Sequence, residues 1–256
     1  RMKRVEVTDP KFYDLGLYFK DGNPTPHGTP EQLLAWAKQM YHALSPETAR
    51  FIDDMFQRET FDVLSRPGKA QGGYCETIPG YGPFVFSNFN GTSGDVDVLT
   101  HEAGHAFQAY VAMENHPPGE LASPGTDSCE IHSMSMEFLT SPWHHLFFGP
   151  DTAKYQLYHA EDSLSFLPYG CLVDEFQQIM YQQPHLTPDE RNRVWLELEH
   201  KYRPWIDFAD LPFYGRGAGW QRQLHIYECP FYYIDYCLAQ TVALQFFAAH
   251  LADPKD

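Results

Sequence analysis

Residues 100–106 read THEAGHA and contain two histidines four positions apart, with a glutamate directly after the first. In a helix, His101 and His105 lie on one face because residues i and i+4 are neighbours. Two imidazoles on one face, with the Glu102 carboxylate beside them, match the H-E-x-x-H pattern that binds zinc and activates a water molecule. The motif therefore predicts a metal-dependent hydrolytic centre in which Glu102 is the base.

A catalytic zinc ion usually takes three protein ligands, so the motif requires a third. The extension H-E-x-x-H-x-x-G-x-x-H does not apply, because Gln108 and Val111 stand where it needs glycine and histidine. The downstream side chains of suitable type are those of Glu114, His116, Glu120, Asp127, Glu130, His132, His144 and His145.

The stretch GTDSCEIHSMSMEFLTSP predicts a second helix over about 127–141, which ends at a proline. Glu130, Ser133 and Glu137 share one face of this helix at positions i, i+3 and i+7. His132 lies about 200° around the helix from Glu130, so the two side chains cannot reach the same ion. We therefore expect Glu130 to be the third ligand and Glu137 to hydrogen-bond one of the ligand histidines.

The rest of the sequence predicts a mainly helical protein with a small sheet beside the motif. A glycine-rich and aromatic segment over about 70–92 predicts a hairpin, with Gly82–Phe89 as its edge strand. We interpret residues 1–256 as a single catalytic domain and as a fragment of a longer protein. Besides the motif helix over about 94–113, the expected helices run over 30–43, 46–64, 151–182, 188–201 and 230–251.

Composition argues against several kinds of partner. The 256 residues carry a formal net charge of −16, whereas binding to nucleic acid needs basic patches. No apolar run reaches the length of a membrane span. The five cysteines are widely spaced and form no C-x-x-C pair, which fits reduced thiols in the cytoplasm.

The segments HEAGHAFQAY and EIHSMSMEF together resemble the oligoendopeptidase F branch of the thimet-oligopeptidase-like metallopeptidases. The resemblance extends to GPFVFSNFNGTSGDVDVL and to HIYECPFYYIDYCLAQTVALQF, so it covers most of residues 70–250. It implies a helical, zincin-type catalytic domain with His101, His105 and Glu130 as zinc ligands and Glu102 as the base. Proteins of this family are much longer, so the chain resembles their catalytic half.

The same resemblance implies residues that stabilise the oxyanion of the reaction, because thimet-type relatives use a histidine and tyrosines near the C-terminus for this purpose. In HIYECPFYYIDY the matching positions are His225, with Tyr232 and Tyr236 on one helical face and Tyr233 offset from them. The spacing differs from that of the thimet type, so the choice of tyrosine stays open. Simple core packing is an alternative for each of these rings.

Together these patterns predict a zinc endopeptidase that holds one zinc ion and cuts short peptides, with no nucleic-acid or membrane partner and an oligomeric state left open. A zinc carboxypeptidase is a second hypothesis, in which Arg216 or Arg222 would bind the terminal carboxylate of the substrate. A third is a catalytically silent protein that binds zinc or peptides. The presence of Glu102 and an open fourth ligand position argue against that third hypothesis.

Overall fold

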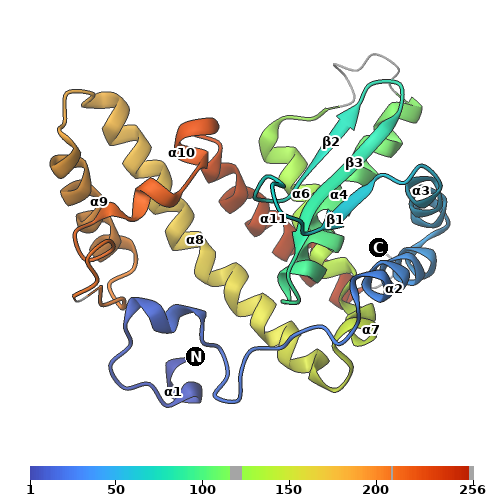
Figure 1. The fold of residues 1–256 in the computed structure, drawn as a ribbon, viewed down its shortest axis with the longest axis horizontal. Coiled ribbons are helices and arrows are strands. Elements are labelled where there is room, and N and C mark those ends of the chain that lie inside the picture. Colours follow the sequence, from blue (N-terminus) through green and yellow to red (C-terminus); the bar gives the residue numbers. More distant parts are fainter. Residues whose placement is uncertain (116–122, 209, 254–256) are drawn as a thin grey trace. The chain divides into compact units, whose positions relative to one another are not determined.

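The computed structural model describes residues 1–115, 123–208 and 210–253, which are mainly helical (Figure 1). Its longer helices are α2 (Pro30–Leu44), α3 (Pro46–Gln57), α4 (Gly94–Asn115), α6 (Thr126–Leu139), α8 (Thr152–Gln182), α9 (Pro188–Tyr202) and α11 (Tyr233–Ala252). Its short helices are α1 (Met2–Val5), α7 (His145–Phe148) and α10 (His225–Glu228), with 3-10 turns η1 (Phe12–Gly16), η2 (Ser141–Trp143), η3 (Gly149–Asp151) and η4 (Ala218–Arg222). The predicted class, mainly helical with one small sheet, is confirmed.

The contacts within the chain divide it into two compact units. Unit 1 comprises Arg1–Asn23 and Tyr158–Leu238, and unit 2 comprises Pro24–Leu157 and Ala239–Asp256. The core of unit 1 is built from Leu172, Val173, Phe176, Trp195, Leu198, Trp220 and Tyr233. The largest buried apolar side chains of unit 2 include Leu33, Met40, Tyr41, Phe51, Ile52, Met55 and Leu99. Within the described part of the chain, no helix combines the length and apolar character needed to cross a membrane.

Three helices begin at the segments TPEQ, SPET and TPDE, in each of which a hydroxyl residue caps the helix and proline follows it. The Thr29 hydroxyl accepts a hydrogen bond from the backbone N–H of Gln32, whose side chain accepts one in return from the N–H of Thr29. Thr187 and Glu190 form the same reciprocal pair at the start of α9, and Ser45 caps α3. Each cap satisfies N–H groups that a helix start would otherwise leave without a partner.

The helix predicted over 46–64 is wrong in its last third, because α3 ends early and β1 (Phe61–Leu64) follows it. Glu59 adopts a left-handed conformation with a φ of 55°, and the N–H of Thr60 donates to the carbonyl of Met55 at 3.1 Å. This type of helix ending normally uses glycine at the left-handed position. A glutamate at this position does not indicate the end of a helix in the sequence. The residues FDVL that follow are compatible with either a helix or a strand.

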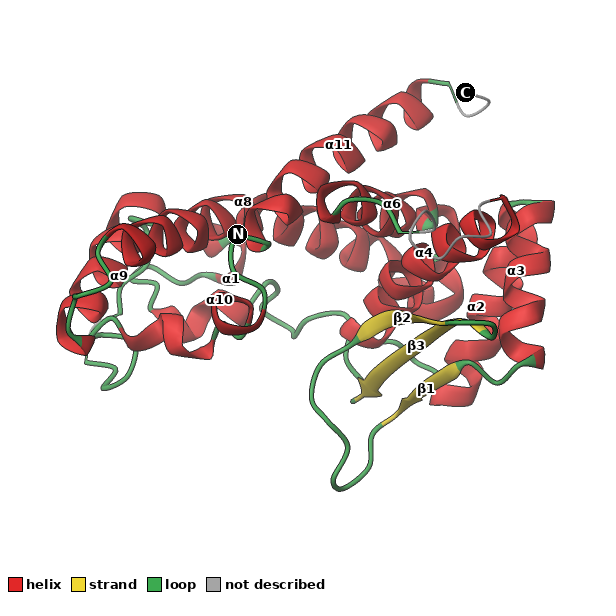
Figure 2. Ribbon diagram, turned by 90° about the horizontal axis from the view of Figure 1, so that it is seen from above, coloured by secondary structure: helices red, strands yellow, loops and turns green. Residues whose placement is uncertain are grey.

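The sheet consists of β1, β2 (Tyr74–Ile78) and β3 (Gly82–Phe89), in the order β1-β3-β2 (Figure 2). β1 pairs parallel to β3, and β2 pairs antiparallel to it with Tyr74 opposite Phe86. The prediction that residues 82–89 form an edge strand is wrong, because β3 is the central strand. β2 is instead an edge strand of the sheet, and it contacts α4, the helix that carries the motif.

Helices α4 and α6 approach each other closely at Gly104, the fourth residue of the HEAGH segment. A Cβ atom added to Gly104 would lie 2.8 Å from the Cα of Ser133 and 3.1 Å from the carbonyl oxygen of His132. These are backbone atoms, so no side-chain movement could make room for a larger residue. Glycine at this position therefore allows the two helices to come into backbone contact.

We expect Gly104→Ala to destabilise the protein. Overpacking costs about 1–3 kcal/mol, which exceeds the roughly 1 kcal/mol that alanine contributes to helix propensity. The free energy of unfolding, measured in urea, should therefore fall. The matched control is Gly94→Ala in the first turn of α4, where the added Cβ would meet only the Thr92 hydroxyl at 3.4 Å. An unchanged or increased stability of Gly104→Ala would contradict the close approach.

Candidate metal centre

A tight turn between β3 and α4 sets the direction of the helix that carries the motif. The buried Asp95 carboxylate accepts hydrogen bonds from the backbone N–H groups of Asn90 and Gly91, at 2.9 and 2.8 Å. Burial raises the pKa of Asp95, although these two bonds act in the opposite direction. Gly91 has a φ of 82°, a left-handed conformation that glycine adopts without strain.

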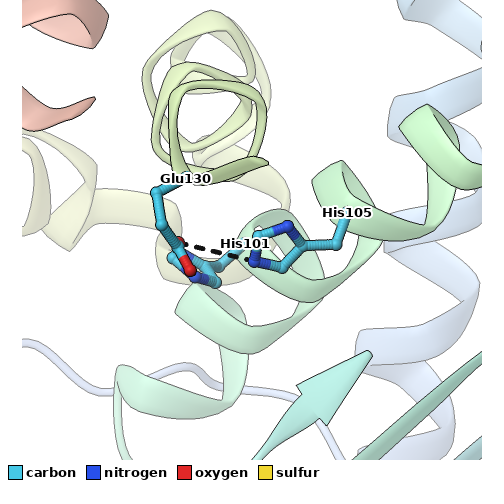
Figure 3. A group of neighbouring side chains, drawn as sticks. All are labelled: His101, His105 and Glu130. Atoms are coloured by element: carbon cyan, nitrogen blue, oxygen red, sulfur yellow. Dashed lines mark ion pairs between the residues drawn. The ribbon is translucent and has the colours of Figure 1, made fainter. Parts of the chain in front are cut away.

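His101, His105 and Glu130 bring their donor atoms together between α4 and α6, within 4.8 Å of one another (Figure 3). The Glu130 Oε2 lies 3.2 Å from the His101 Nε2 and 3.5 Å from the His105 Nε2. Ligands about 2.0–2.1 Å from a tetrahedral zinc ion lie about 3.3 Å from each other. The carboxylate oxygen therefore lies at about the distance from each nitrogen that two ligands of one zinc ion would have.

The other downstream candidates that the structure describes do not join this group. Among the residues that the structure describes, no further set of three His, Cys, Asp or Glu side chains brings its donors this close. His116 and Glu120 lie outside the described residues. The choice of Glu130 over His132, made from helix geometry, agrees with the observed grouping.

Two further side chains of α6 hold the donors in place. The Glu137 Oε1 lies 2.6 Å from the Nδ1 of His101, which leaves the Nε2 of the same ring facing Glu130. The Ser133 hydroxyl donates to the Glu130 Oε2 at 2.9 Å. Such partners orient metal ligands and adjust their basicity. Glu130, Ser133 and Glu137 thus share one face of α6, as their spacing predicts.

The charges of this group are strongly coupled. Burial alone would lower the pKa of His101, but its hydrogen bonds to Glu130 and Glu137 bring that pKa well above the usual value. Burial would raise the pKa of Glu130, but the bonds to His101 and His105 bring it well below its usual range. Without a metal ion, the positively charged form of His101 is therefore favoured between the two carboxylates.

Glu102 is buried beside the donor group, with 8% of its surface exposed. Burial raises its pKa, while the neighbouring histidines act to lower it. A Cβ added to Gly73 would lie 3.7 Å from the Glu102 Oε1, so the backbone just before β2 passes this carboxylate. A carboxylate with a raised pKa is a stronger base than an exposed one, and glycine keeps the space beside it open.

The backbone beside Glu102 is fixed to the sheet by a buried lysine and an asparagine. Lys69, with only 1% of its side chain exposed, donates to the carbonyl oxygens of Asp62 and Leu64 at 2.8 and 2.9 Å and to that of Ser87. The amide of Asn88 donates to the carbonyls of Ala70 and Gly72 at 2.8 and 3.1 Å. These anchors cannot be predicted from the sequence pattern, because they depend on contacts across the sheet.

His225, Tyr232 and Tyr236 lie together in unit 1. The Tyr236 hydroxyl is 3.5 Å from the Nε2 of His225, and the ring centroids of Tyr232 and Tyr236 are 4.9 Å apart. Tyr233 points into the core of the same unit, where burial raises its pKa. The structure thus separates one buried tyrosine from a half-buried group of one histidine and two tyrosines.

Comparison with known proteins gives consistent matches. The sequence model of peptidase family M3 matches residues 35–256. A solved structure provisionally described as oligoendopeptidase F is 50% identical, with a TM-score of 0.96 over 99% of this chain and 45% of that chain. A structure of PZ peptidase A with an inhibitor is 49% identical, with the same TM-score and coverage of both chains.

Among curated proteins, oligoendopeptidase F (chromosomal) of Lactococcus lactis subsp. cremoris is 26% identical over 117 residues, which are 46% of this chain and 19% of that protein. The chain spans less than half the length of the relatives that it matches. The family match nevertheless includes α4, α6 and every other element from the middle of α2 onward. The chain therefore belongs to peptidase family M3, as its resemblance to oligoendopeptidase F predicts.

Proposed function

We propose that this chain holds one zinc ion through His101, His105 and Glu130 and hydrolyses internal bonds of short peptides. The observation that carries the proposal is a donor group spaced for zinc, with the buried Glu102 next to it on the same helix. Membership of peptidase family M3 supports the reaction class. The five cysteines are all free thiols, and the cytoplasm remains the proposed location.

When bound, zinc would supply Lewis acidity, which makes a water that it holds acidic near neutral pH and polarises a carbonyl oxygen. Glu102 takes a proton from the attacking water and delivers it to the nitrogen of the leaving amine. Burial raises the pKa of Glu102, which makes its carboxylate a stronger base for the first of these transfers. Glu137 keeps His101 in the orientation that presents Nε2.

The edge of β2 is the proposed place for the peptide backbone. An extended peptide can add to a sheet edge through main-chain hydrogen bonds, which depend little on side chains. Gly73 leaves space beside Glu102 just before this strand. We further propose that His225, with Tyr232 or Tyr236, donates hydrogen bonds to the oxyanion.

The carboxypeptidase alternative needs a cation that binds the terminal carboxylate of the substrate. Arg222 already donates to the Tyr214 hydroxyl and lies over its ring. Arg216 is the other cation that this alternative could use, and a peptide with both ends blocked distinguishes the two activities.

We expect Glu102→Gln to abolish cleavage while zinc remains bound. Loss of a general base should lower the rate about 10²- to 10⁴-fold. The measurement combines zinc content with cleavage of an internally quenched, end-blocked peptide, and the control is Glu47→Gln, an exposed carboxylate on α3. Cleavage only of peptides with a free C-terminus would indicate a carboxypeptidase. Bound zinc without cleavage by the unaltered chain would indicate a silent protein.

Glu137→Gln should weaken zinc binding without removing a ligand. The amide can still accept a hydrogen bond from the His101 Nδ1, but it no longer contributes a negative charge. Loss of such a partner typically costs about 10- to 100-fold in metal affinity, which competition with a chelator would measure. An affinity equal to that of the unaltered chain, with Glu47→Gln measured beside it, would exclude this role for Glu137.

Zinc uptake should release about one proton per chain near neutral pH, because the metal needs the His101 Nε2 lone pair that the raised pKa keeps protonated. Zinc affinity should accordingly increase with pH. Calorimetric titration of chelator-treated protein in two buffers of different ionisation enthalpy measures the number of protons released. Identical binding heats in both buffers would contradict a protonated His101.

The same pKa shifts define how the stability of the metal-free protein depends on pH. The raised pKa of His101 stabilises the fold below about pH 6.5, and this contribution is lost as pH rises through the folded-state value. The lowered pKa of Glu130 stabilises the fold above about pH 4.3 and is lost on acidification. Both contributions are present together between these two limits.

A further inference from the structure

A chain of hydrogen bonds in unit 1 leads from Tyr169 on α8 to His225 at the start of α10. The Tyr169 hydroxyl donates to the Gln223 Oε1 at 2.8 Å, and the Gln223 Nε2 lies 2.7 Å from the Nδ1 of His225. On the other side of the ring, the Nε2 of His225 lies 3.5 Å from the Tyr236 hydroxyl. Both ring nitrogens of His225 therefore face a defined neighbour.

The chemistry of the carboxamide fixes the direction of these bonds. A glutamine side chain has an oxygen that only accepts and a nitrogen that only donates. Because Tyr169 donates to the oxygen of Gln223, the nitrogen faces His225. The Nδ1 of His225 must then accept, so it carries no hydrogen. In a neutral imidazole the single ring hydrogen consequently resides on Nε2.

The first donor in the chain is held firmly. The Tyr169 ring packs edge-on against Trp195 and Tyr233, with centroid distances of 6.2 and 5.9 Å, and the Arg203 guanidinium lies 4.6 Å from its centroid. Burial raises the pKa of Tyr169 to about 12, so its hydroxyl keeps its hydrogen at neutral pH. Rotation of the Gln223 amide would replace the bond from Tyr169 with one that the amide nitrogen donates to the Tyr169 oxygen, and it would turn the amide oxygen towards the Nδ1 of His225.

We propose that Tyr169 and Gln223 are positioning residues that hold His225 in the neutral tautomer with its hydrogen on Nε2. In this state His225 presents a donor, and not a lone pair, to whatever lies beyond Nε2. The consequence for catalysis rests on the proposed function, in which His225 donates to the oxyanion. Neither positioning residue would need to touch the substrate.

Nitrogen-15 NMR of histidine-labelled protein tests the tautomer directly, because protonated and unprotonated ring nitrogens resonate at different frequencies. A His225→Asn variant assigns the signal. At neutral pH the unaltered chain should show an unprotonated Nδ1 and a protonated Nε2. Tyr169→Phe, which frees the amide to rotate, and Gln223→Leu, which removes the donor, should each give a mixture of tautomers.

A reversed variant and a matched control complete the test. Gln223→Glu places an acceptor opposite Nδ1 and should put a hydrogen on that nitrogen. Tyr202→Phe removes a hydroxyl that donates to Glu175 elsewhere in unit 1, so it should leave the His225 signal unchanged. The proposal is overturned if the unaltered chain carries a hydrogen on Nδ1, or if folded Tyr169→Phe and Gln223→Leu proteins keep its tautomer.

Peptide cleavage separates this proposal from the proposed function. Tyr169→Phe should lower kcat about 10-fold with little change in KM, which is less than the roughly 10²- to 10³-fold cost of losing an oxyanion donor itself. If the tautomer changes as expected while kcat does not, the positioning role stands. In that case it is the oxyanion role of His225 that fails.

Discussion

The backbone contact between α4 and α6 at Gly104 is the constraint on which the grouping of His101, His105 and Glu130 depends. Helices usually pack with their axes roughly 8–10 Å apart, which side chains must span. Because Gly104 has no side chain, the two helices lie closer together. The Glu130 carboxylate on α6 can then reach the imidazoles of His101 and His105 on α4. The same proximity allows Glu137 and Ser133 to reach the atoms that they orient.

His101 and His225 show that the hydrogen-bond partner of Nδ1 determines whether the Nε2 of an imidazole accepts or donates. At His101 that partner is a carboxylate, Glu137, which accepts from Nδ1 and directs Nε2 towards Glu130, the orientation that metal ligation would require. At His225 the partner is a carboxamide, Gln223, which donates to Nδ1 and leaves the hydrogen on Nε2. Exchanging an oxygen for an NH₂ group in the partner thus converts an acceptor histidine into a donor.

The sequence predicts the parts of the structure that depend on local spacing. The i, i+4 histidines, the shared face of Glu130 and Ser133 and the capped helix starts all follow from residues within about two turns of one another. Other features depend on residues that are distant in sequence or belong to no recognisable motif. They are the central position of β3, the hydrogen bonds of Lys69 and the bond from Tyr169 to Gln223. The end of α3 was missed for a different reason, because Glu59 occupies a position where glycine is the usual signal.

The imidazolium of His101, held between Glu130 and Glu137, has a consequence for the metal-free centre. Two buried carboxylates facing each other would repel, and many small metal sites cannot form until their ion arrives. Here a proton supplies the missing positive charge. A proton and a metal ion can therefore take the same electrostatic role between these carboxylates.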